Sequence, residues 1–599
     1  MLNKNLSKEV FLEVKLTDCY TLSEGKALMS GTEALVRLLL EQSRIDRLNG
    51  LRTKGLVSGY PGSPLGGLDI ALGKAKAFLD EEGIHFQPAV NEELAATALW
   101  GSQHINLYDN PDIQGVFSMW YGKGPGLDRA MDALRHANQG GVAPHGGMVI
   151  AVGDDPTGKS STLAYQSDQN FHSLGIPYFF PKNVSDIIPM GLEAFALSRY
   201  SGCCVGLKIV VDTADSNAVV DMSKLRPSLP ILTPNSLVHV TKHDPASVRE
   251  SKLHDVRLPA VQTWCENSEN VAQVYLPAKK GETRLGIIGV GKIANEVNEA
   301  LAGLLPDRGK KNTVAFTAIN MPWPLPEKKI STMLSVVEEV LVIEEKRSFV
   351  EEQIAKICLK QDRRILLSGK TNPDGTNLLP SYGELSLENI LNVIAARASH
   401  HSIALNPIKK APIVSPLSEI PIRQPYYCAG CPHNSSTKVS DDEIVGMGIG
   451  CHSISGFINP DTITNFTQMG GEGAFWIGRS PFSDRSHSFQ NMGDGTYAHS
   501  GYLGVRAAVA AGVNITFKML VNDAVAMTGG QSAQGGSSPL SMSEQLLAEG
   551  VKKVVIVSDQ PDQIRLKGSW PASVDFCHRD NILRVQDDLS QSQGASALL

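Results

Sequence analysis

The sequence lacks the features that mark membrane and secreted proteins. No run of about 18 consecutive apolar residues occurs in the 599-residue chain, so we expect no membrane-spanning helix. The first residues, MLNKNLSKE, contain no uninterrupted apolar segment of the kind that a signal peptide needs. Only nine cysteines occur, and without a signal peptide we expect them to be reduced thiols. These absences together predict a cytoplasmic protein.

Excess charge and repetition are also absent. The net charge of −7 and the sequence pI near 6.1 give no electrostatic case for a nucleic-acid or anionic-membrane partner. We find no internal repeat and no low-complexity tract. The composition is that of a soluble globular protein, and the length predicts three or more domains.

Strand-like and helix-like segments alternate along most of the chain, which predicts an α/β fold of several domains with parallel sheets. Buried-type strands occur at residues 116–120 and 148–152, and Ser30 with Glu33 forms a capping-box pattern that predicts the start of a helix. The predicted divisions are an N-terminal tail (1–24), an α/β domain (25–235), an irregular connection (236–282), a middle α/β domain (283–400), a Pro-rich linker (401–425) and a third α/β domain (426–599). The last residues read as the start of a strand, so we expect a fragment of a longer protein.

The most informative motif is Gly493-Asp494-Gly495-Thr496 followed at a distance by Asn522. A small-residue helix at 501–512 and a strand at 515–521 separate the two. This order of elements puts both turns at the same end of a parallel sheet, where α/β proteins bind ligands. A carboxylate and an amide there suit Mg²⁺, which is commonly shared with phosphates. The pattern is the signature of a thiamine diphosphate site; the alternative is a Gly-rich turn and an unrelated Asn.

Three cysteines form a second candidate site. Cys428 and Cys431 make a CxxC motif followed by proline, and Cys451 lies among glycines. Three thiolates suit a soft metal or an iron–sulfur cluster, which usually takes four cysteines. CxxC alone also suits redox chemistry or zinc, and three buried cysteines without a ligand remain an alternative. Weak candidates for a fourth ligand are Cys577, His433 and His452.

A thiamine enzyme also needs a carboxylate against N1′ of the aminopyrimidine, from a domain other than the one that binds the diphosphate. Glu92 and Glu93 open a predicted helix after a strand. The helix dipole favours an acidic residue at either position. Spacing alone therefore does not choose between them.

Two further motifs match nucleotide-binding patterns. Residues 153–160 (GDDPTGKS) match a P-loop, but two carboxylates and Pro156, which lacks an N–H, work against phosphate binding. Residues 289–294 (GVGKIA) match a Rossmann turn, but no acidic residue ends a second strand at the expected distance. We therefore expect neither ATP nor NAD.

These residues together resemble the 2-oxoacid:ferredoxin oxidoreductase family, in particular the fused indolepyruvate type, from about Tyr20 to Leu599. The segments that carry the resemblance are 58–67 (SGYPGSPLGG), 90–92, 120–126 (WYGKGPG), 428–434, 467–473 (TQMGGEG), 493–496 and 522–531. It implies a domain of pyrimidine-binding type at 25–235, a middle domain like the C-terminal domain of transketolase, and a diphosphate-binding domain at 426–599. It also implies oxidative decarboxylation of an indolepyruvate-like aryl 2-oxo acid to its acyl-CoA, with electron transfer to ferredoxin.

The resemblance implies roles for single residues. Glu92 would be the N1′ carboxylate, and Ser63 lies in the loop that faces cofactor and substrate. The magnesium ligands would be Asp494, Asn522 and the carbonyl of Ala524, with Gly470, Gly471, Gly493 and Gly495 in the thiamine diphosphate site, and the [4Fe-4S] ligands would be Cys428, Cys431 and Cys451. The fourth cysteine would lie just past Leu599, and a homodimer is expected. The alternatives are a non-oxidative thiamine decarboxylase or carboligase and an inactive cofactor-binding fragment.

Overall fold

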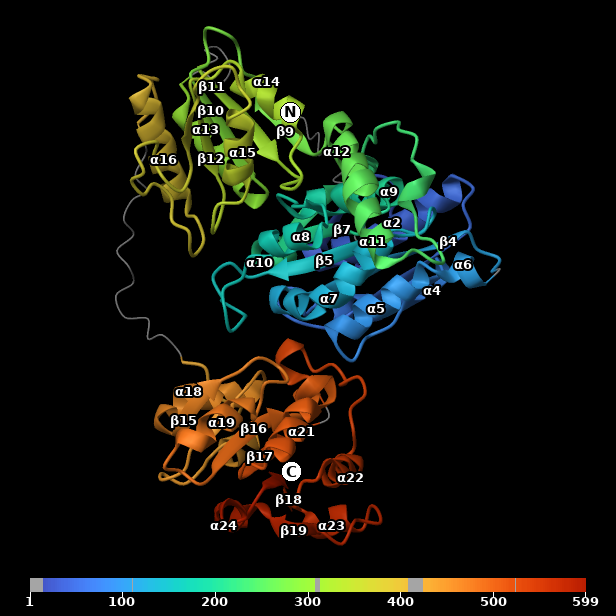
Figure 1. Ribbon diagram of the computed structural model, residues 1–599, viewed down its shortest axis with the longest axis vertical. Coiled ribbons are helices and arrows are strands. Elements are labelled where there is room, and N and C mark those ends of the chain that lie inside the picture. The colour runs from blue at the N-terminus through green and yellow to red at the C-terminus, as the bar shows by residue number, and fades with distance from the viewer. Residues whose placement is uncertain (1–14, 110, 307–312, 408–423, 523) are drawn as a thin grey trace, which may run out of the picture. The chain divides into compact units, whose positions relative to one another are not determined.

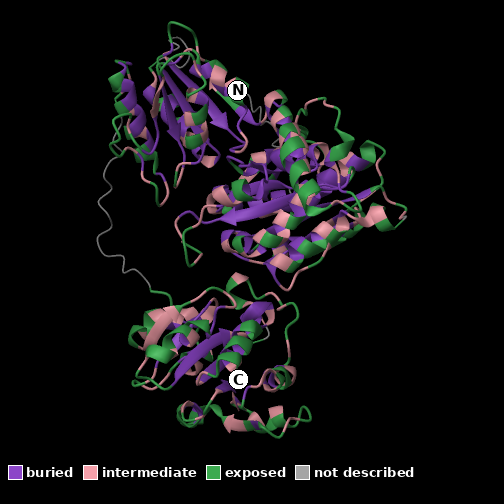
Figure 2. Cartoon of the chain, viewed as in Figure 1, coloured by how far each residue is buried: buried purple, intermediate pink, exposed green. Residues whose placement is uncertain are grey.

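The computed structural model describes residues 15–109, 111–306, 313–407, 424–522 and 524–599 (Figure 1). These residues form two compact units. Unit 1 holds the described residues from 15 to 407 except 89–91, and unit 2 holds 89–91 and those from 424 to 599. In both units the strands are mostly buried between helices (Figure 2). Among the described residues, no helix is long and apolar enough to cross a bilayer.

The first part of unit 1 is built on a six-stranded parallel sheet of order β3-β2-β4-β5-β7-β6. The strands are β2 (Thr53–Gly59), β3 (Ile84–Phe86), β4 (Gly115–Lys123), β5 (Met148–Asp154), β6 (Tyr178–Phe179) and β7 (Val205–Val210). The helices are α1 (Asp18–Thr21), α2 (Gly31–Leu48), α3 (Leu68–Lys74), α4 (Lys76–Glu81), α5 (Glu92–Ser102), α6 (Ile105–Tyr108), α7 (Gly124–Gly140), α8 (Asp168–Leu174), α9 (Val184–Ser201) and α10 (Val211–Asp215). A small antiparallel pair consists of β1 (Lys26–Ser30), which precedes the six strands in the sequence, and β8 (Asn217–Asp221), which follows them.

The predicted capping box starts α2. The Ser30 hydroxyl accepts a hydrogen bond from the Glu33 N–H at 3.2 Å, and the Glu33 carboxylate accepts one from the Ser30 N–H at 2.8 Å. Two of the N–H groups that a helix start leaves unpaired are thereby satisfied.

The connection over 236–282 is more regular than expected. It contains α11 (Ala246–Ser251), a π-helical segment η3 (Lys252–Arg257), α12 (Leu258–Asn267) and strand β9 (Ala272–Leu276). Pro245 precedes this helical run, where a missing N–H would be unpaired in any case, whereas Pro259 lies within the run, directly after the π-helical segment that interrupts the regular α-helical hydrogen bonding. Short 3₁₀ turns, η1 (Met222–Lys224) and η2 (Ser236–Val238), precede them.

The middle part of unit 1 has a five-stranded sheet of order β13-β12-β10-β11-β9. All its pairings are parallel except that of β9 with β11. Its elements are β10 (Leu285–Val290), α13 (Lys292–Leu304), β11 (Val314–Ile319), α14 (Glu327–Leu334), β12 (Glu339–Ile343), α15 (Val350–Cys358), β13 (Leu366–Ser368) and α16 (Leu387–His400).

Unit 2 is built on a seven-stranded parallel sheet of order β15-β14-β16-β17-β20-β18-β19. Its strands are β14 (Val445–Met447), β15 (Ile463–Phe466), β16 (Ser488–Gly493), β17 (Ile515–Leu520), β18 (Lys553–Ser558), β19 (Val574–His578) and β20 (Ala595–Leu598). Its helices are α17 (His433–Ser436), α18 (Ser455–Ile458), α19 (Ala474–Arg479), α20 (Asp494–Thr496), α21 (Tyr502–Ala511), α22 (Pro539–Glu549), α23 (Pro561–Arg565) and α24 (Ile582–Ser590). Shorter turns are η4 (Cys451–Ile454), η5 (Pro460–Thr462), η6 (Ser480–Phe482), η7 (Tyr497–Gly501), η8 (Ala526–Thr528) and η9 (Arg579–Asn581).

The predicted fold class, several α/β domains with parallel sheets, is confirmed. The strand expected at the end of the sequence is β20, which pairs with β17 and β18 inside the sheet. The predicted Pro-rich linker lies largely outside the described residues, as does most of the predicted N-terminal tail. The domain boundaries themselves remain predictions.

Candidate functional site

Asp494 and Asn522 lie at the carboxyl ends of neighbouring strands in unit 2. Gly493, the last residue of β16, stands in parallel register with Leu520 of β17. The Asp494 carboxylate accepts hydrogen bonds from the Gly495 N–H through Oδ1 and from the Asn522 N–H through Oδ2, both at 2.8 Å. The carboxylate is therefore held by both turns at once, as the motif predicted for one end of a parallel sheet.

The oxygens in this pair of turns are of the kind that Mg²⁺ prefers. Asp494 is buried, and the Asn522 side chain is exposed with its Oδ1 accepting the Ala524 N–H at 3.1 Å. A Cβ added at Gly493 would meet nothing within 4 Å, so open space lies beside the carboxylate turn. The donor set and this space fit a divalent cation and a bound phosphate.

The turn at Gly470 and Gly471, which was predicted to lie in the thiamine diphosphate site, is held by side chains of unit 2. Gly470 has φ +86° and its N–H donates to the buried Glu472 carboxylate at 2.7 Å. A Cβ at Gly470 would lie 2.4 Å from the Ser500 hydroxyl, so only glycine fits this turn. The Gly470 N–H is thus already bonded to protein in this structure.

The three predicted cluster cysteines lie in one region of unit 2. Burial raises the pKa of the Cys451 thiol, and the nearby Cys431 and Cys428 thiols raise it further. A cation bound beside Cys451 would offset this effect and favour its thiolate. Cys428 is exposed and the other two are half-buried, and Gly430 between the CxxC cysteines has φ +75° with open space at its Cβ position. The three sulfur atoms do not all lie within 4.8 Å of one another, so they form no compact single-metal site as they stand, and their donor chemistry suits a cluster instead.

The three weak candidates for a fourth ligand, Cys577, His433 and His452, lie in different surroundings. Cys577 lies in β19, at the opposite edge of the sheet from β14, whose loop carries Cys451. His452 is buried and its Nε2 accepts the Gly448 N–H at 3.2 Å, while burial lowers its pKa to about 3. His433 Nδ1 lies 3.2 Å from Cys431 Sγ. The structure therefore brings His433 to the cysteines, ties His452 to a backbone turn and separates Cys577 from both.

The cysteine region and the Asp494 turn are neighbours. The Thr496 hydroxyl donates to the Ile449 carbonyl at 3.0 Å, two residues before Cys451. Burial lowers the pKa of His433, and the Asp494 carboxylate opposes that shift. Sequence spacing gave no sign of either link, because both depend on how the loops after β14 and β16 meet.

Glu92 and Glu93, which the sequence could not separate, differ in the structure. Glu92 is buried, whereas the Glu93 side chain is 45% exposed and lies 4.0 Å from Arg129. A Cβ at Gly126, in the first turn of α7, would lie 2.8 Å from the Glu92 carboxylate oxygen Oε1. Glycine at this position is what allows the carboxylate to pack against α7.

Sequence reasoning assigned no role to the end of β4, although WYGKGPG is a distinctive segment. Trp120 Nε1 donates to the Glu92 carbonyl at 3.0 Å. Burial lowers the pKa of Lys123, and the Glu92 and Asp155 carboxylates oppose that shift. The position of Lys123 directly after a buried strand was the available signal, because strand ends are where α/β proteins place functional groups.

Ser63 contacts the segment that resembles a P-loop. Its hydroxyl donates to the Ser160 hydroxyl at 2.7 Å. Asp155 Oδ2 accepts the Ser160 N–H at 2.7 Å, and Asp155 Oδ1 accepts the Lys159 N–H at 3.1 Å. The N–H groups that would bind a phosphate are therefore bonded to the loop's own carboxylate, which supports the expectation of no ATP site.

The Rossmann-like turn is also closed. Gly291 has φ +52°, and a Cβ there would lie 2.1 Å from the Phe180 ring. The Lys292 ammonium bonds Glu384 at 2.6 Å and pairs with Asp212. An aromatic ring and two carboxylates next to the helix start disfavour a pyrophosphate.

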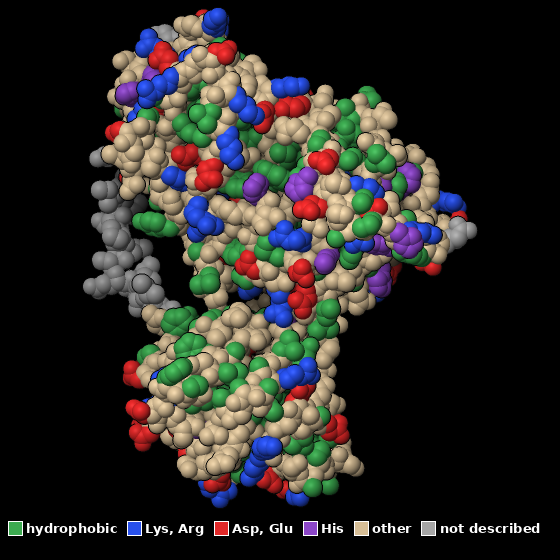
Figure 3. Space-filling view, viewed as in Figure 1, with side chains coloured by type: hydrophobic (Ala, Val, Ile, Leu, Met, Phe, Trp, Pro, Cys, Tyr) green, Lys and Arg blue, Asp and Glu red, His purple; other side chains and the backbone are tan. Residues whose placement is uncertain are grey.

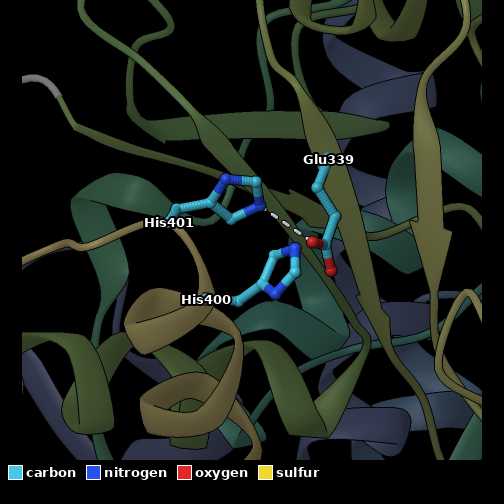
Figure 4. A group of neighbouring side chains, drawn as sticks. All are labelled: Glu339, His400 and His401. Carbon is cyan, nitrogen blue, oxygen red and sulfur yellow. Dashed lines mark hydrogen bonds and ion pairs between the residues drawn. The ribbon is translucent and has the colours of Figure 1, made fainter.

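One group among the described residues has metal-ligand atoms within 4.8 Å of one another: Glu339, His400 and His401 (Figure 4). The buried Glu339 carboxylate already accepts two hydrogen bonds from Arg397 at 2.7 Å and one from Ser368 at 2.6 Å. His401 Nε2 lies 2.8 Å from it. A guanidinium at the carboxylate repels a cation, so this cluster is a structural ion pair in the middle sheet.

Comparisons with known proteins agree over nearly the whole chain. The family model of the indolepyruvate oxidoreductase domain matches residues 277–412. The indolepyruvate oxidoreductase subunit IorA of Methanothermobacter thermautotrophicus is 27% identical, covering 91% of this chain and 84% of the relative. That of Methanothermobacter marburgensis is 26% identical, covering 87% and 79%. The chain is similar to indolepyruvate oxidoreductase subunits over most of its length. It is an oxidoreductase, as its sequence predicted.

A solved structure with partial likeness is the 2-oxoglutarate:ferredoxin oxidoreductase from Magnetococcus marinus. It is 17% identical with a TM-score of 0.42, covering 62% of this chain and 65% of its own. At this score the likeness supports no argument about the site.

Proposed function

We propose that this indolepyruvate oxidoreductase relative catalyses the oxidative decarboxylation of an aryl 2-oxo acid to its acyl-CoA and passes the electrons to ferredoxin. The observation that carries the proposal is the Asp494 carboxylate, bonded at 2.8 Å to the backbone of Asn522 at the end of the next parallel strand. The relatives, which share 26–27% identity over most of the chain, support the same reaction class.

Thiamine diphosphate supplies the electron sink that decarboxylation of a 2-oxo acid needs, and a [4Fe-4S] cluster carries single electrons. Asp494, Asn522 and the Ala524 carbonyl would hold Mg²⁺, with the glycines 470, 471, 493 and 495 near the diphosphate. Cys428, Cys431 and Cys451 would hold the cluster.

Glu92 is the proposed acid–base carboxylate. Its burial against Gly126 keeps bulk water from its oxygens. Burial lowers the pKa of the Lys123 ammonium, which interacts electrostatically with the Glu92 carboxylate. A buried carboxylate beside a partly destabilised cation can hold or release a proton toward a ring nitrogen. Ser63, fixed by its hydrogen bond to Ser160, would orient the substrate in the same unit.

The cysteine region would also tune its group through protein contacts. The half-buried Cys431 has His433 Nδ1 at 3.2 Å, close enough for a weak N–H to sulfur hydrogen bond. Hydrogen bonds to ligating sulfur make the site more electron-accepting. His433 would therefore act as a positioning residue.

The proposed partners are the 2-oxo acid, coenzyme A, ferredoxin and a second copy of the chain. Unit 2 carries exposed phenylalanine side chains on and beside its edge strand β15, namely Phe457, Phe466, Phe475 and Phe482. Figure 3 shows hydrophobic side chains gathered over the part of unit 2 where α18, β15 and α19 lie. Exposed aromatic groups of this kind mark interaction surfaces, which supports an oligomer.

The reaction is tested by anaerobic turnover of indolepyruvate, with each product measured separately. The full reaction releases CO₂, forms an acyl-CoA and reduces ferredoxin. Omission of coenzyme A should stop acyl-CoA formation. CO₂ release without ferredoxin reduction in the reconstituted protein would instead favour the non-oxidative decarboxylase. Binding of the cofactor with no product at all would favour the inactive fragment.

A further inference from the structure

A cavity of about 760 Å³ is lined by residues of unit 1, and neither Glu92 nor Ser63 is among them. Its walls come from α9 on one side and from β9, the end of β11 and α14 on the other. This volume falls in the range of about 300–1,000 Å³ typical of small-molecule sites. It therefore has room for a ligand that neither nucleotide-like motif nor the proposed active site explains.

A buried ammonium lines the cavity. The Lys182 side chain is 7% exposed, and its Nζ lies 3.2 Å from Gln273 Oε1 and 3.3 Å from Asn320 Oδ1. Its carboxylate partner, Asp186, is 3.4 Å away. Two neutral amides and one long ion pair compensate a buried charge weakly, so an anion there would be stabilised.

The buried Glu193, which also lines the cavity, has its own hydrogen-bond partners. Glu193 accepts hydrogen bonds from Trp264, Ser268 and Asn270, which occupy both its oxygens. A second ammonium, that of Lys329, lines the cavity and bonds the Ser268 carbonyl at 2.6 Å.

Part of the wall is apolar. Met190, Ile330 and Met333 line the cavity from α9 and α14, together with Leu276 of β9. Methionine side chains adapt to irregular apolar groups. The cavity thus combines a buried ammonium with adaptable apolar side chains.

The geometry points to a binding site for a small carboxylate that carries an apolar side chain, with its carboxylate at Lys182 and its side chain against Met190 and Met333. Two sources share this chemistry: an aryl 2-oxo acid, and the aromatic amino acid that carries an ammonium in place of the oxo group. Asp186 and the exposed Glu269 also line the cavity, but they pair with Lys182 at 3.4 Å and with Lys329 at 3.2 Å, so the ammonium of an amino acid would compete for them. Because α9 and α14 belong to different sheet domains of unit 1, a ligand there ties the two together.

The test titrates the full chain, without added cofactors, with phenylpyruvate, L-phenylalanine and phenethylamine, which lacks the carboxylate. Calorimetry gives Kd, and thermal unfolding reports stabilisation. The variants are Lys182→Met, which removes the cation, and Thr332→Trp, which adds bulk at an exposed position of the cavity wall. Lys328→Met, an exposed lysine of α14 that does not line the cavity, is the matched control.

We expect at least one carboxylate probe to bind saturably, to raise the unfolding temperature and to lose tenfold or more in affinity in both cavity variants. Lys328→Met and Glu92→Gln should bind as the unchanged protein does, which separates this site from the proposed active site. Tighter binding of L-phenylalanine identifies the amino acid as the source; tighter binding of phenylpyruvate identifies the oxo acid. The inference is overturned if neither carboxylate binds, if phenethylamine binds equally well, or if affinity is unchanged in Thr332→Trp. The Thr332→Trp variant keeps the test valid if Lys182→Met does not fold.

Discussion

Asp494 Oδ2 accepts the backbone N–H of Asn522 at 2.8 Å, which joins the turns after β16 and β17 at the carboxyl end of the unit 2 sheet. The carboxylate on one turn is fixed by the backbone of the other, so neither turn can shift alone. The proposed magnesium site therefore rests on a pair of residues that the fold itself holds together.

The cysteine assignment predicts the outcome of single substitutions. Cys451→Ser should reduce the iron bound after anaerobic reconstitution to near zero, because a hydroxyl is a poor ligand for iron in a cluster. Cys577→Ser is the matched control, since Cys577 lies in β19 at the other edge of the sheet. Iron analysis and the visible absorption of the reconstituted protein give the readout. Equal iron loss in both variants would refute the assignment.

The role given to Glu92 predicts a change in rate without a change in fold. Glu92→Gln should lower kcat by about 10²- to 10⁴-fold, the usual contribution of a general acid–base group, while thiamine diphosphate affinity changes little. Glu93→Gln, at the exposed neighbouring position, should stay within a few-fold of the unchanged enzyme. Steady-state kinetics together with cofactor titration separate the two effects. A Glu92→Gln enzyme with normal kcat would exclude this carboxylate.

Lys518 makes the stability of unit 2 depend on pH. It is fully buried in β17, its Nζ donates to the Lys438 carbonyl at 2.7 Å, and burial lowers its pKa to about 7. The unfolded side chain titrates near 10.4, so between about pH 7 and 10 the unfolded chain binds a proton that the folded chain does not. Below pH 7, burying the charged ammonium lowers the free energy of unfolding by on the order of 4 kcal/mol. This cost falls as pH rises through that window.

Lys518→Met should therefore raise the free energy of unfolding at pH 6.5 and flatten its rise between pH 7 and 9.5. The Lys438 carbonyl keeps the hydrogen bond from Gln586 at 3.1 Å. Urea unfolding across this pH range, beside the exposed Lys567→Met, provides the measurement. A variant that is less stable at pH 6.5, with the pH dependence intact, would contradict the account.

The middle sheet also gains stability as pH rises, but in the acid range and from a favourable ion pair. Burial raises the pKa of Glu339, but the hydrogen bonds from Arg397, Ser368 and His401 outweigh it and hold the pKa below its usual range. A lowered carboxylate pKa gives stability that is present above the ordinary value near pH 4.5 and is lost as pH falls through the lower folded value.

Glu339→Gln should cost about 3–5 kcal/mol at pH 7, because it leaves the Arg397 guanidinium buried without its counter-charge. Glu338→Gln, on the neighbouring exposed side chain, should cost less than about 1 kcal/mol. Denaturant unfolding of both variants at pH 7 and pH 4 measures the difference. If zinc raised the unfolding temperature of the unchanged protein and not of Glu339→Gln, the cluster would be a metal site after all.

Short sequence patterns predicted the elements that depend only on residues close together in the chain. The Ser30 and Glu33 capping box and the β16–α21–β17 order follow from short patterns, and the structure contains both. The connection at 236–282 is more helical than expected, because Pro245 precedes the helical run and Pro259 follows its π-helical segment.

The parts of the site that sequence could not give depend on distant contacts. Glu92 is separated from Glu93 by burial against Gly126, and the P-loop pattern is closed by Asp155. The Rossmann-like turn is covered by Phe180, which lies more than one hundred residues earlier in the chain. Each of these outcomes depends on a side chain whose position only the folded structure determines.

The most direct test of the central claim is anaerobic calorimetry of thiamine diphosphate binding to the full chain, with and without Mg²⁺. The account predicts saturable binding that requires Mg²⁺ and that Asp494→Ala abolishes, while Asp559→Ala, at an exposed aspartate of unit 2, binds normally. Binding that is independent of Mg²⁺, or equally tight in Asp494→Ala, would contradict it.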